Sequence, residues 1–242
     1  MNTIPSAIFA IALVIMALIG AHTVGTVVAK NDTISVTGKA EHNFEADLIQ
    51  WRVIFQRLAP TTQEGYRQLK QDARTVKAYL QSKGVKEEEM VLSSVESYEN
   101  YSTVYNEAKG ETVQIPQGMR VSQAIIIKST DIDRIATVSR EVTDLLEQGI
   151  DLASANPEYL YTKLSDLKLK LIADATADGY KRAVKIADNS AADVARLRSA
   201  KLGVFQITAE NSTDEYSGGG AFDTSSRRKT ASITIKLDYG ID

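Results

Sequence analysis

The sequence predicts an α+β fold of two subdomains, with mixed or antiparallel sheets and with helices on one face. Segments in which apolar and polar residues alternate predict strands, and segments with apolar residues at three- and four-residue steps predict amphipathic helices. The order strand, helix, strand occurs twice, over 45–101 and 119–161, and one long amphipathic helix follows. An apolar N-terminal run precedes these elements and predicts a transmembrane helix.

Residues 7–28 form this apolar run, which at about 22 residues is long enough to cross a hydrocarbon core of about 30 Å. We interpret residues 1–29 as a retained anchor or as a secretory signal cut after Ala29. The anchor is favoured because the run exceeds a usual signal core of about 7 to 15 residues and no Lys or Arg precedes it. The predicted anchor residues are Ile8, Phe9, Ile11, Leu13, Val14, Ile15, Leu18 and Ile19.

The remaining residues, 30–242, are expected to form one extracytoplasmic body, in the periplasm or outside the cell. A cytoplasmic body stays the alternative, because Lys30 follows the run and only the terminal amine precedes it. The net charge of -3 argues against nucleic-acid binding. The absence of cysteine from the sequence excludes disulfides, thiol catalysis and cysteine-ligated metal centres.

The first predicted elements form a strand–helix–strand unit. A brief strand over 34–38 and a longer one over 45–55 are expected to pair as a hairpin. A helix capped by Thr61 runs to Gly84, and a strand follows over 90–101.

Residues 106–118 contain two glycines and a proline and predict a turn or flexible excursion, with the subdomains meeting near 102–118. The elements expected after it are a strand over 119–128, a helix capped by Ser129 or Thr130 and ended by Gly149, a strand over 150–155, a long helical stretch over 163–202 with a break at Asn189–Ser190, a strand over 204–208, an open loop over 213–226 and a closing strand over 229–239.

Four features of these segments resemble the SIMPL-domain family (domain of unknown function 541). They are the strand Ile34–Gly38, the alanine-rich part of the long helix, the step Lys201–Val204 and the final strand over 231–237. The resemblance spans about residues 33–239 and implies an α+β body of two subdomains, an extracytoplasmic location and assembly into symmetric rings or cages. The segments 196–211 and 222–226 look like those of a membrane-anchored subgroup of the family.

Motifs of known chemistry are missing from the sequence. No nucleophile elbow, P-loop or dinucleotide fingerprint is present, and the only histidines are His22 and His42. Asp174 and Asp178 stand one helical turn apart, but neighbouring cations favour a solvated face. His42 is expected on a turn or surface, residues 87–89 in a solvated turn, and Asp131 and Asp133 at a helix N-terminus. We therefore predict no catalytic, cofactor or metal site.

Tyrosines provide the candidate interface, because their rings bury apolar area and keep a hydrogen bond. The residues are Tyr98, Tyr101, Tyr105, Tyr159 and Tyr161; a place at the rim of the core is the plainer alternative. The first hypothesis is a non-enzymatic, membrane-anchored envelope protein that self-assembles into a symmetric ring or cage as a scaffold or compartment, with itself and the membrane as partners. The alternatives are an enzyme of unrecognised type that uses carboxylates, and a module that binds peptide or envelope polymer through the loops 106–118 and 213–226. The sequence does not identify a small-molecule ligand.

Overall fold

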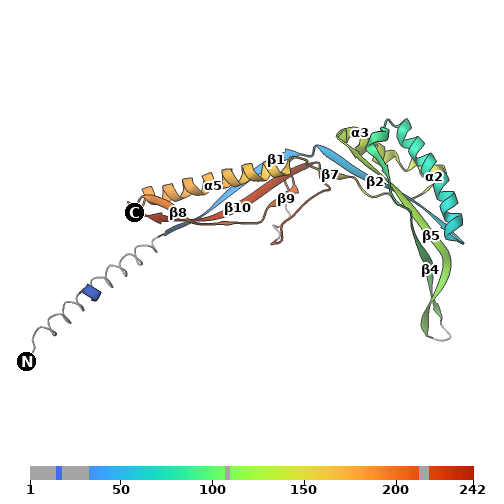
Figure 1. Ribbon diagram of the computed structural model, residues 1–242, viewed down its shortest axis with the longest axis horizontal. Helices are drawn as coiled ribbons and strands as arrows, with labels where there is room; N and C mark the ends of the chain where they lie inside the picture. Colours follow the sequence, from blue (N-terminus) through green and yellow to red (C-terminus); the bar gives the residue numbers. More distant parts are fainter. Residues whose placement is uncertain (1–14, 18–32, 107–109, 213–217) are drawn as a thin grey trace, which may run out of the picture.

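The computed structural model describes residues 15–17, 33–106, 110–212 and 218–242. The described residues from 33 onwards form two lobes, each with its own sheet and core (Figure 1). The strands of both sheets pair in antiparallel fashion. Helices and sheets together confirm the predicted α+β class.

The first lobe is a four-stranded sheet covered on one face by the long helix α5 (Leu164–Asp188) (Figure 1). Its strands are β1 (Thr33–Glu45), β10 (Arg228–Ile241), β8 (Val194–Leu202) and β9 (Gln206–Ala209). The central strand β10 pairs with β1 along one edge and with β8 and β9 along the other. Alternate residues of β10 from Ala231 to Tyr239 are buried beneath α5, as their period of two predicts.

The expected hairpin between the first two strands is wrong. β1 is longer than predicted and pairs over its whole length with β10, from Thr33 opposite Gly240 to Glu45 opposite Arg228. The chain then bends at Ala46 and Asp47 and continues as β2 in the other sheet. Two consecutive strands therefore belong to different lobes, β1 paired with β10 and β2 paired with β5.

The predicted break in the long helical stretch is confirmed, since α5 ends at Asp188 with Asn189 as its C-cap. The expectation of helix beyond the break is wrong, because residues 194–202 form β8 on the edge of β10. The apolar positions of α5 are not all buried: Tyr180 is 49% exposed, although its ring packs against Tyr239. The neighbouring Gly179 is buried instead and lets the helix approach β1 closely at Gly38.

The second lobe is a six-stranded sheet with helices on one face (Figure 1). Its central strand β2 (Leu48–Ala59) pairs with β5 (Glu111–Ser129) on one side and with the short strands β6 (Asp151–Leu152) and β7 (Glu158–Leu160) on the other. β3 (Met90–Leu92) and β4 (Glu96–Asn106) pair with the far edge of β5. The helical elements are α2 (Thr62–Ser82), η1 (Glu87–Glu89), α3 (Ile132–Glu141) and α4 (Asp144–Glu147).

Helix α2 confirms its predicted cap, because the Thr61 hydroxyl accepts a hydrogen bond from the Glu64 N–H at 3.3 Å. Its buried stripe contains Leu69, Val76 and Leu80, together with Gly65 in place of the exposed Tyr66. The buried Asp72 accepts two hydrogen bonds from Arg57 of β2, at 2.5 and 2.8 Å. This bidentate pair fixes the helix to the sheet.

Three other expectations in this lobe need correction. The strand over 90–101 is interrupted, so that β3 and β4 pair separately with β5. The excursion over 106–118 lies in the hairpin formed by β4 and β5, of which 107–109 are outside the described residues. The next helix begins with Asp131 as its N-cap and divides into α3 and α4.

The chain crosses between the lobes at Ala46–Asp47 and between β7 and α5. At the crossing, Thr162 donates from its N–H and its hydroxyl to the Asp47 carboxylate, each at 2.7 Å. The Tyr159 N–H donates to the Thr224 carbonyl at 2.7 Å. The sequence predicts that the subdomains meet near 102–118, and the described residues of this range, 102–106 and 110–118, lie within the β4–β5 hairpin of one sheet.

Apart from 15–17, the predicted anchor lies outside the described residues. Ile15, one of the anchor residues, is 51% exposed. None of the helices in the described ranges combines the length and apolar character needed to cross a bilayer.

Candidate functional site

The clearest candidate surface is the end of the β4–β5 hairpin. β5 pairs with β2 only as far as Met119, opposite Ala59, so the described residues 101–106 and 110–118 have no third strand beside them. We call this part the hairpin arm, and Figure 1 shows it projecting from the second lobe. Isolated two-stranded hairpins are marginally stable at best in water, so an arm of this kind gains from a partner.

Both faces of the hairpin arm carry exposed apolar side chains. Because successive side chains of a strand point to opposite faces, Val104, Val113 and Ile115 share one face and Tyr101, Tyr105 and Pro116 share the other. Val104 and Ile115 are 47% and 44% exposed, and Tyr101 and Tyr105 are 46% and 62% exposed. Contiguous exposed apolar surface of this kind is typical of interaction sites.

The five tyrosines of the predicted interface occupy two separate places. Tyr101 and Tyr105 lie on the hairpin arm, and Tyr98 lies at its base with 53% of its surface exposed. Tyr159 and Tyr161 lie half-buried between the lobes, where Tyr161 packs on Phe44 with ring centroids 4.8 Å apart.

This second place is a cluster around a buried lysine, and we call it the junction cluster. Its residues line a cavity of about 20 Å³ and include Phe44, Tyr159, Tyr161, Phe222, Asp223 and Lys229. The side chain of Lys229 is only 3% exposed; its ammonium donates to the Asp223 carbonyl and lies 3.5 Å from Asp223 Oδ2. The cavity is too small for an organic ligand, so the cluster is a structural contact between the lobes.

Burial shifts the pKa values of Lys229 and Asp223. Burial lowers the pKa of Lys229, and the charge of Asp223 partly opposes this change. Burial by itself raises the pKa of Asp223, but hydrogen bonds from Ser225 and Ser226 and the charge of Lys229 hold it at about 2. The Asp223 Oδ2 atom is buried and accepts no hydrogen bond within the described part of the chain, so its compensation is the Lys229 charge.

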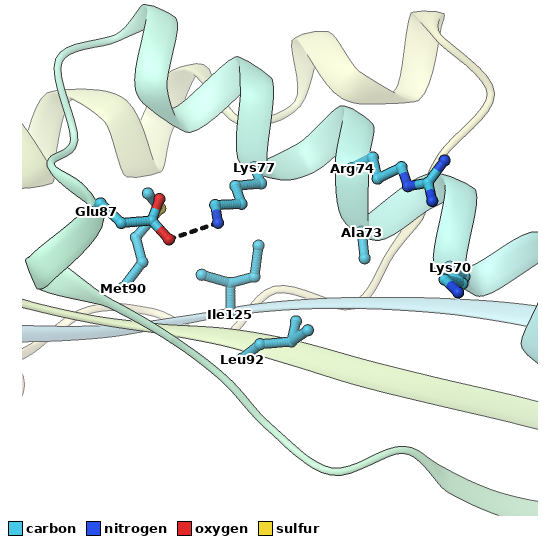
Figure 2. A pocket seen from close by; sticks show the side chains of 8 residues that line it. All are labelled: Lys70, Ala73, Arg74, Lys77, Glu87, Met90, Leu92 and Ile125. Carbon is cyan, nitrogen blue, oxygen red and sulfur yellow. Dashed lines mark hydrogen bonds and ion pairs between the residues drawn. The ribbon is translucent and has the colours of Figure 1, made fainter.

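A groove lies between helix α2 and strand β3, and we call it the α2–β3 groove. It has a volume of about 270 Å³. Figure 2 shows Ala73, Met90, Leu92 and Ile125 on its apolar inner surface, with Lys70, Arg74 and Lys77 extending from the helix. Lys77 forms an ion pair with Glu87 at 2.5 Å.

The structure places the carboxylate and histidine candidates at separate positions of the first lobe. Asp174 is exposed, whereas Asp178 accepts the Lys39 N–H at 2.9 Å and Arg182 Nε at 2.8 Å. The Lys39 N–H and Arg182 lower the pKa of Asp178, which is the sign of a structural acceptor. His42, expected on a turn or surface, lies partly exposed in β1 opposite Ala231. No three His, Cys, Asp or Glu side chains of the described residues are placed to hold a metal.

The expected solvated turn at residues 87–89 is wrong for Glu89. Its carboxylate accepts hydrogen bonds from Arg134 Nη2 at 2.8 Å, from the Ser129 hydroxyl at 2.5 Å and from the Lys86 N–H at 2.8 Å. Burial by itself raises the pKa of Glu89, but these three donors outweigh it and hold the pKa at about 2. Glu89 therefore ties η1 to α3 and to the end of β5.

This contact predicts an acid-dependent loss of stability. Because the pKa of Glu89 falls from 4.5 to about 2 on folding, the ionised carboxylate contributes about 3 kcal/mol to the free energy of unfolding. This contribution is fully present above pH ~4.5 and is lost as the pH falls towards ~2. By pH ~3 about 2 kcal/mol of this is lost. Urea unfolding at pH 7 and pH 3 should show a smaller acid-induced loss for Glu89→Gln than for the unaltered chain. Equal losses in both proteins would contradict this role for Glu89.

Sequence reasoning missed two sets of residues. Lys229 stands in the same period of two as Ala231 and Ile233, a signal that places it on the buried face of its strand. Lys70, Arg74 and Lys77 follow each other at helical steps on α2, which places them on one side of the helix. Their position beside an uncovered strand could not be predicted, because it depends on the long-range pairing of β3 with the edge of β5.

A family model described as SIMPL, protein of unknown function (DUF541), matches residues 34–239. The match begins in β1 and ends in β10, so it includes both lobes. No curated protein matches the chain.

Proposed function

This chain belongs to the SIMPL family of proteins of unknown function, and from this premise we propose that it is a non-enzymatic envelope protein that self-associates through its hairpin arm. The observation that carries the proposal is the arm itself, whose two apolar faces lie beyond the end of β2. A second copy of the chain would cover apolar surface that this copy leaves in water.

The proposal includes the N-terminal run as a retained anchor of a membrane-bound subgroup, with the two lobes on the extracytoplasmic side. Its support is the length and apolar composition of residues 7–28. Anchored copies share one plane, and a head-to-tail contact repeated in that plane closes into a ring when its rotation allows. The role of such an assembly is that of a scaffold or compartment.

The hairpin arm provides the test. Tyrosines at the centre of an interface contribute about 2 kcal/mol or more each, so Tyr101→Ser with Tyr105→Ser should weaken self-association by about a thousandfold. Light scattering of the membrane-extracted full chain should give an oligomer for the unaltered protein and a lower mass for the double variant at micromolar concentration.

The matched control is Tyr66→Ser with Leu146→Ser, because these side chains are 50% and 52% exposed but lie outside the arm. The control should keep the mass of the unaltered chain. A monomeric unaltered chain at micromolar concentration would overturn self-association, and an oligomeric arm variant would exclude the arm as the interface. Identification of the N-terminal residue in the same sample distinguishes the anchor from a cleaved signal.

A further inference from the structure

A second surface of the same lobe has an unpaired sheet edge. β3 is the outermost strand of its sheet at this point, and it pairs with β5 through Val91 opposite Ile126 and Leu92 opposite Ile125. The next residue, Ser93, donates its N–H to the Ala124 carbonyl at 2.8 Å. Because hydrogen-bonded and non-hydrogen-bonded pairs alternate in antiparallel strands, the N–H and C=O of Leu92 point away from β5, towards the open edge.

Side chains around this edge are also uncovered. Val91 and Leu92 are 62% and 54% exposed. Helix α2 packs on β5 and β2, so the face of β3 beside the helix remains open as the α2–β3 groove. A strand with unpaired main-chain groups and exposed apolar residues is a template for another strand.

Positive charge lies along the helical side of the groove. Lys77 is compensated by Glu87, whereas Lys70 and Arg74 form no ion pair within the described ranges. The unpaired cations therefore stand above an apolar surface, with Leu92 at the strand edge (Figure 2). The occupant that complements these features has a main chain to pair with β3, apolar side chains for the inner surface and carboxylates for the two cations.

We propose that the α2–β3 groove binds an extended peptide segment of a partner protein, which adds as a strand to β3. Alternate residues of the segment, those facing α2, are apolar or acidic. This is strand addition beside a helix, in which main-chain hydrogen bonds supply affinity and alternate side chains supply specificity. A fatty-acid anion matches the charge and the apolar surface but cannot pair with Leu92, so the open edge favours a peptide.

The test uses the full-length chain and the fluorescein-labelled peptide acetyl-Glu-Thr-Leu-Thr-Glu-Thr-Leu-amide, whose Glu and Leu residues share one face of a strand. Fluorescence anisotropy should show saturable binding, and the matched peptide with Lys in place of Glu should bind at least about tenfold more weakly. Lys70→Gln with Arg74→Gln should weaken binding of the Glu peptide by about tenfold. Arg67→Gln, which removes a cation of the same helix outside the groove lining, should leave it unchanged.

The strand edge is tested separately. Leu92→Pro removes the N–H that points to the open edge and retains the pairing of Val91 and Ser93 with β5. Proline is tolerated on sheet edges, and the variant should bind the peptide about tenfold more weakly. N-methylation of alternate peptide amides gives the same information if Leu92→Pro does not fold. Absence of Glu-peptide binding, equal binding of the Lys peptide, or binding that is insensitive to both edge changes would overturn the proposal. Decanoate that displaces the peptide with equal affinity would identify an amphiphile site and also overturn it.

Discussion

Replacement of Lys229 by alanine is expected to lower the free energy of unfolding by about 3 to 5 kcal/mol, the usual effect of breaking a buried ion pair. The physical reason is that the variant leaves the Asp223 carboxylate buried without a compensating charge. Asp223 Oδ2 is buried and accepts no hydrogen bond from the described residues, so the Lys229 charge is its compensation. Chemical denaturation with circular dichroism measures the change.

Two further variants separate the charge from the packing. Lys229→Met keeps an unbranched apolar side chain, so its effect reports mainly the uncompensated Asp223. Combination with Asp223→Asn removes that charge and should recover part of the lost stability, because replacing both members of a buried pair is far less costly than removing one. Lys236→Met, at an exposed position of the same strand, should change stability by no more than about 0.5 kcal/mol. If Lys229→Met is as harmless as this control, the pair contributes nothing.

Gly38→Ala is expected to lower the free energy of unfolding by about 3 kcal/mol or more, at or above the usual range for an overpacked core. An alanine Cβ at this position would lie 2.0 Å from the Ala175 carbonyl oxygen and 2.7 Å from the Gly179 nitrogen. Both atoms belong to the backbone of α5, so no side-chain rotation relieves the clash. The helix must move away from β1 and lose the packing of residues such as Leu171 and Ala183, which are fully buried.

A graded series of glycine variants checks this explanation. Gly179→Ala places its Cβ 2.5 Å from Leu237 Cδ1, the end of a side chain, and 3.3 Å from the Gly38 nitrogen, a milder backbone contact than that of Gly38→Ala. Alanine also favours the helix by about 1 kcal/mol. Its net cost should therefore be about 1 kcal/mol or less. Gly218→Ala, with no atom within 4 Å of the added Cβ, should have no measurable effect. Thermal unfolding of the three variants should follow this order, and a Gly38→Ala protein as stable as Gly218→Ala would contradict the close approach of α5 to β1.

The sequence predicted the elements whose signals are local. The Thr61 cap, the break at Asn189 and the alternation of β10 all lie where the pattern places them. Each depends on residues a few positions apart, such as a hydroxyl that reaches the third N–H of its own helix. These local signals do not depend on the rest of the chain.

The sequence-based predictions were wrong for segments whose structure depends on pairing with another strand. Residues 194–202 have apolar positions that continue a helical spacing, yet they form β8 because the edge of β10 is available to them. The residues of the hairpin arm contain glycine and proline, which predicted a loop, but pairing between β4 and β5 keeps them in a ladder with a bulge at Asn100 and Tyr101. Long-range pairing overrode local preference in both cases.

The candidate surfaces, too, were predictable from the sequence only in part. The sequence alone indicates the tyrosines at 98, 101 and 105 as interface candidates, because amphipathic rings are frequent at protein interfaces. The separation of this group from Tyr159 and Tyr161 followed only from the two-lobed structure. The α2–β3 groove followed only from the structure, because it depends on how α2 packs on the sheet and on the pairing of β3 with the edge of β5.

The sequence by itself determined the α+β class, the Thr61 cap, the helix break at Asn189 and the alternation of β10, because periodicity and capping act over one or two turns of chain. Only the tertiary structure decided that β1 pairs with β10, that Lys229 is enclosed between the lobes and that the hairpin arm extends beyond β2. The physical reason is distance along the chain. Thr33 and Gly240 meet across almost its whole length, and which edges pair depends on the area that all the elements bury together.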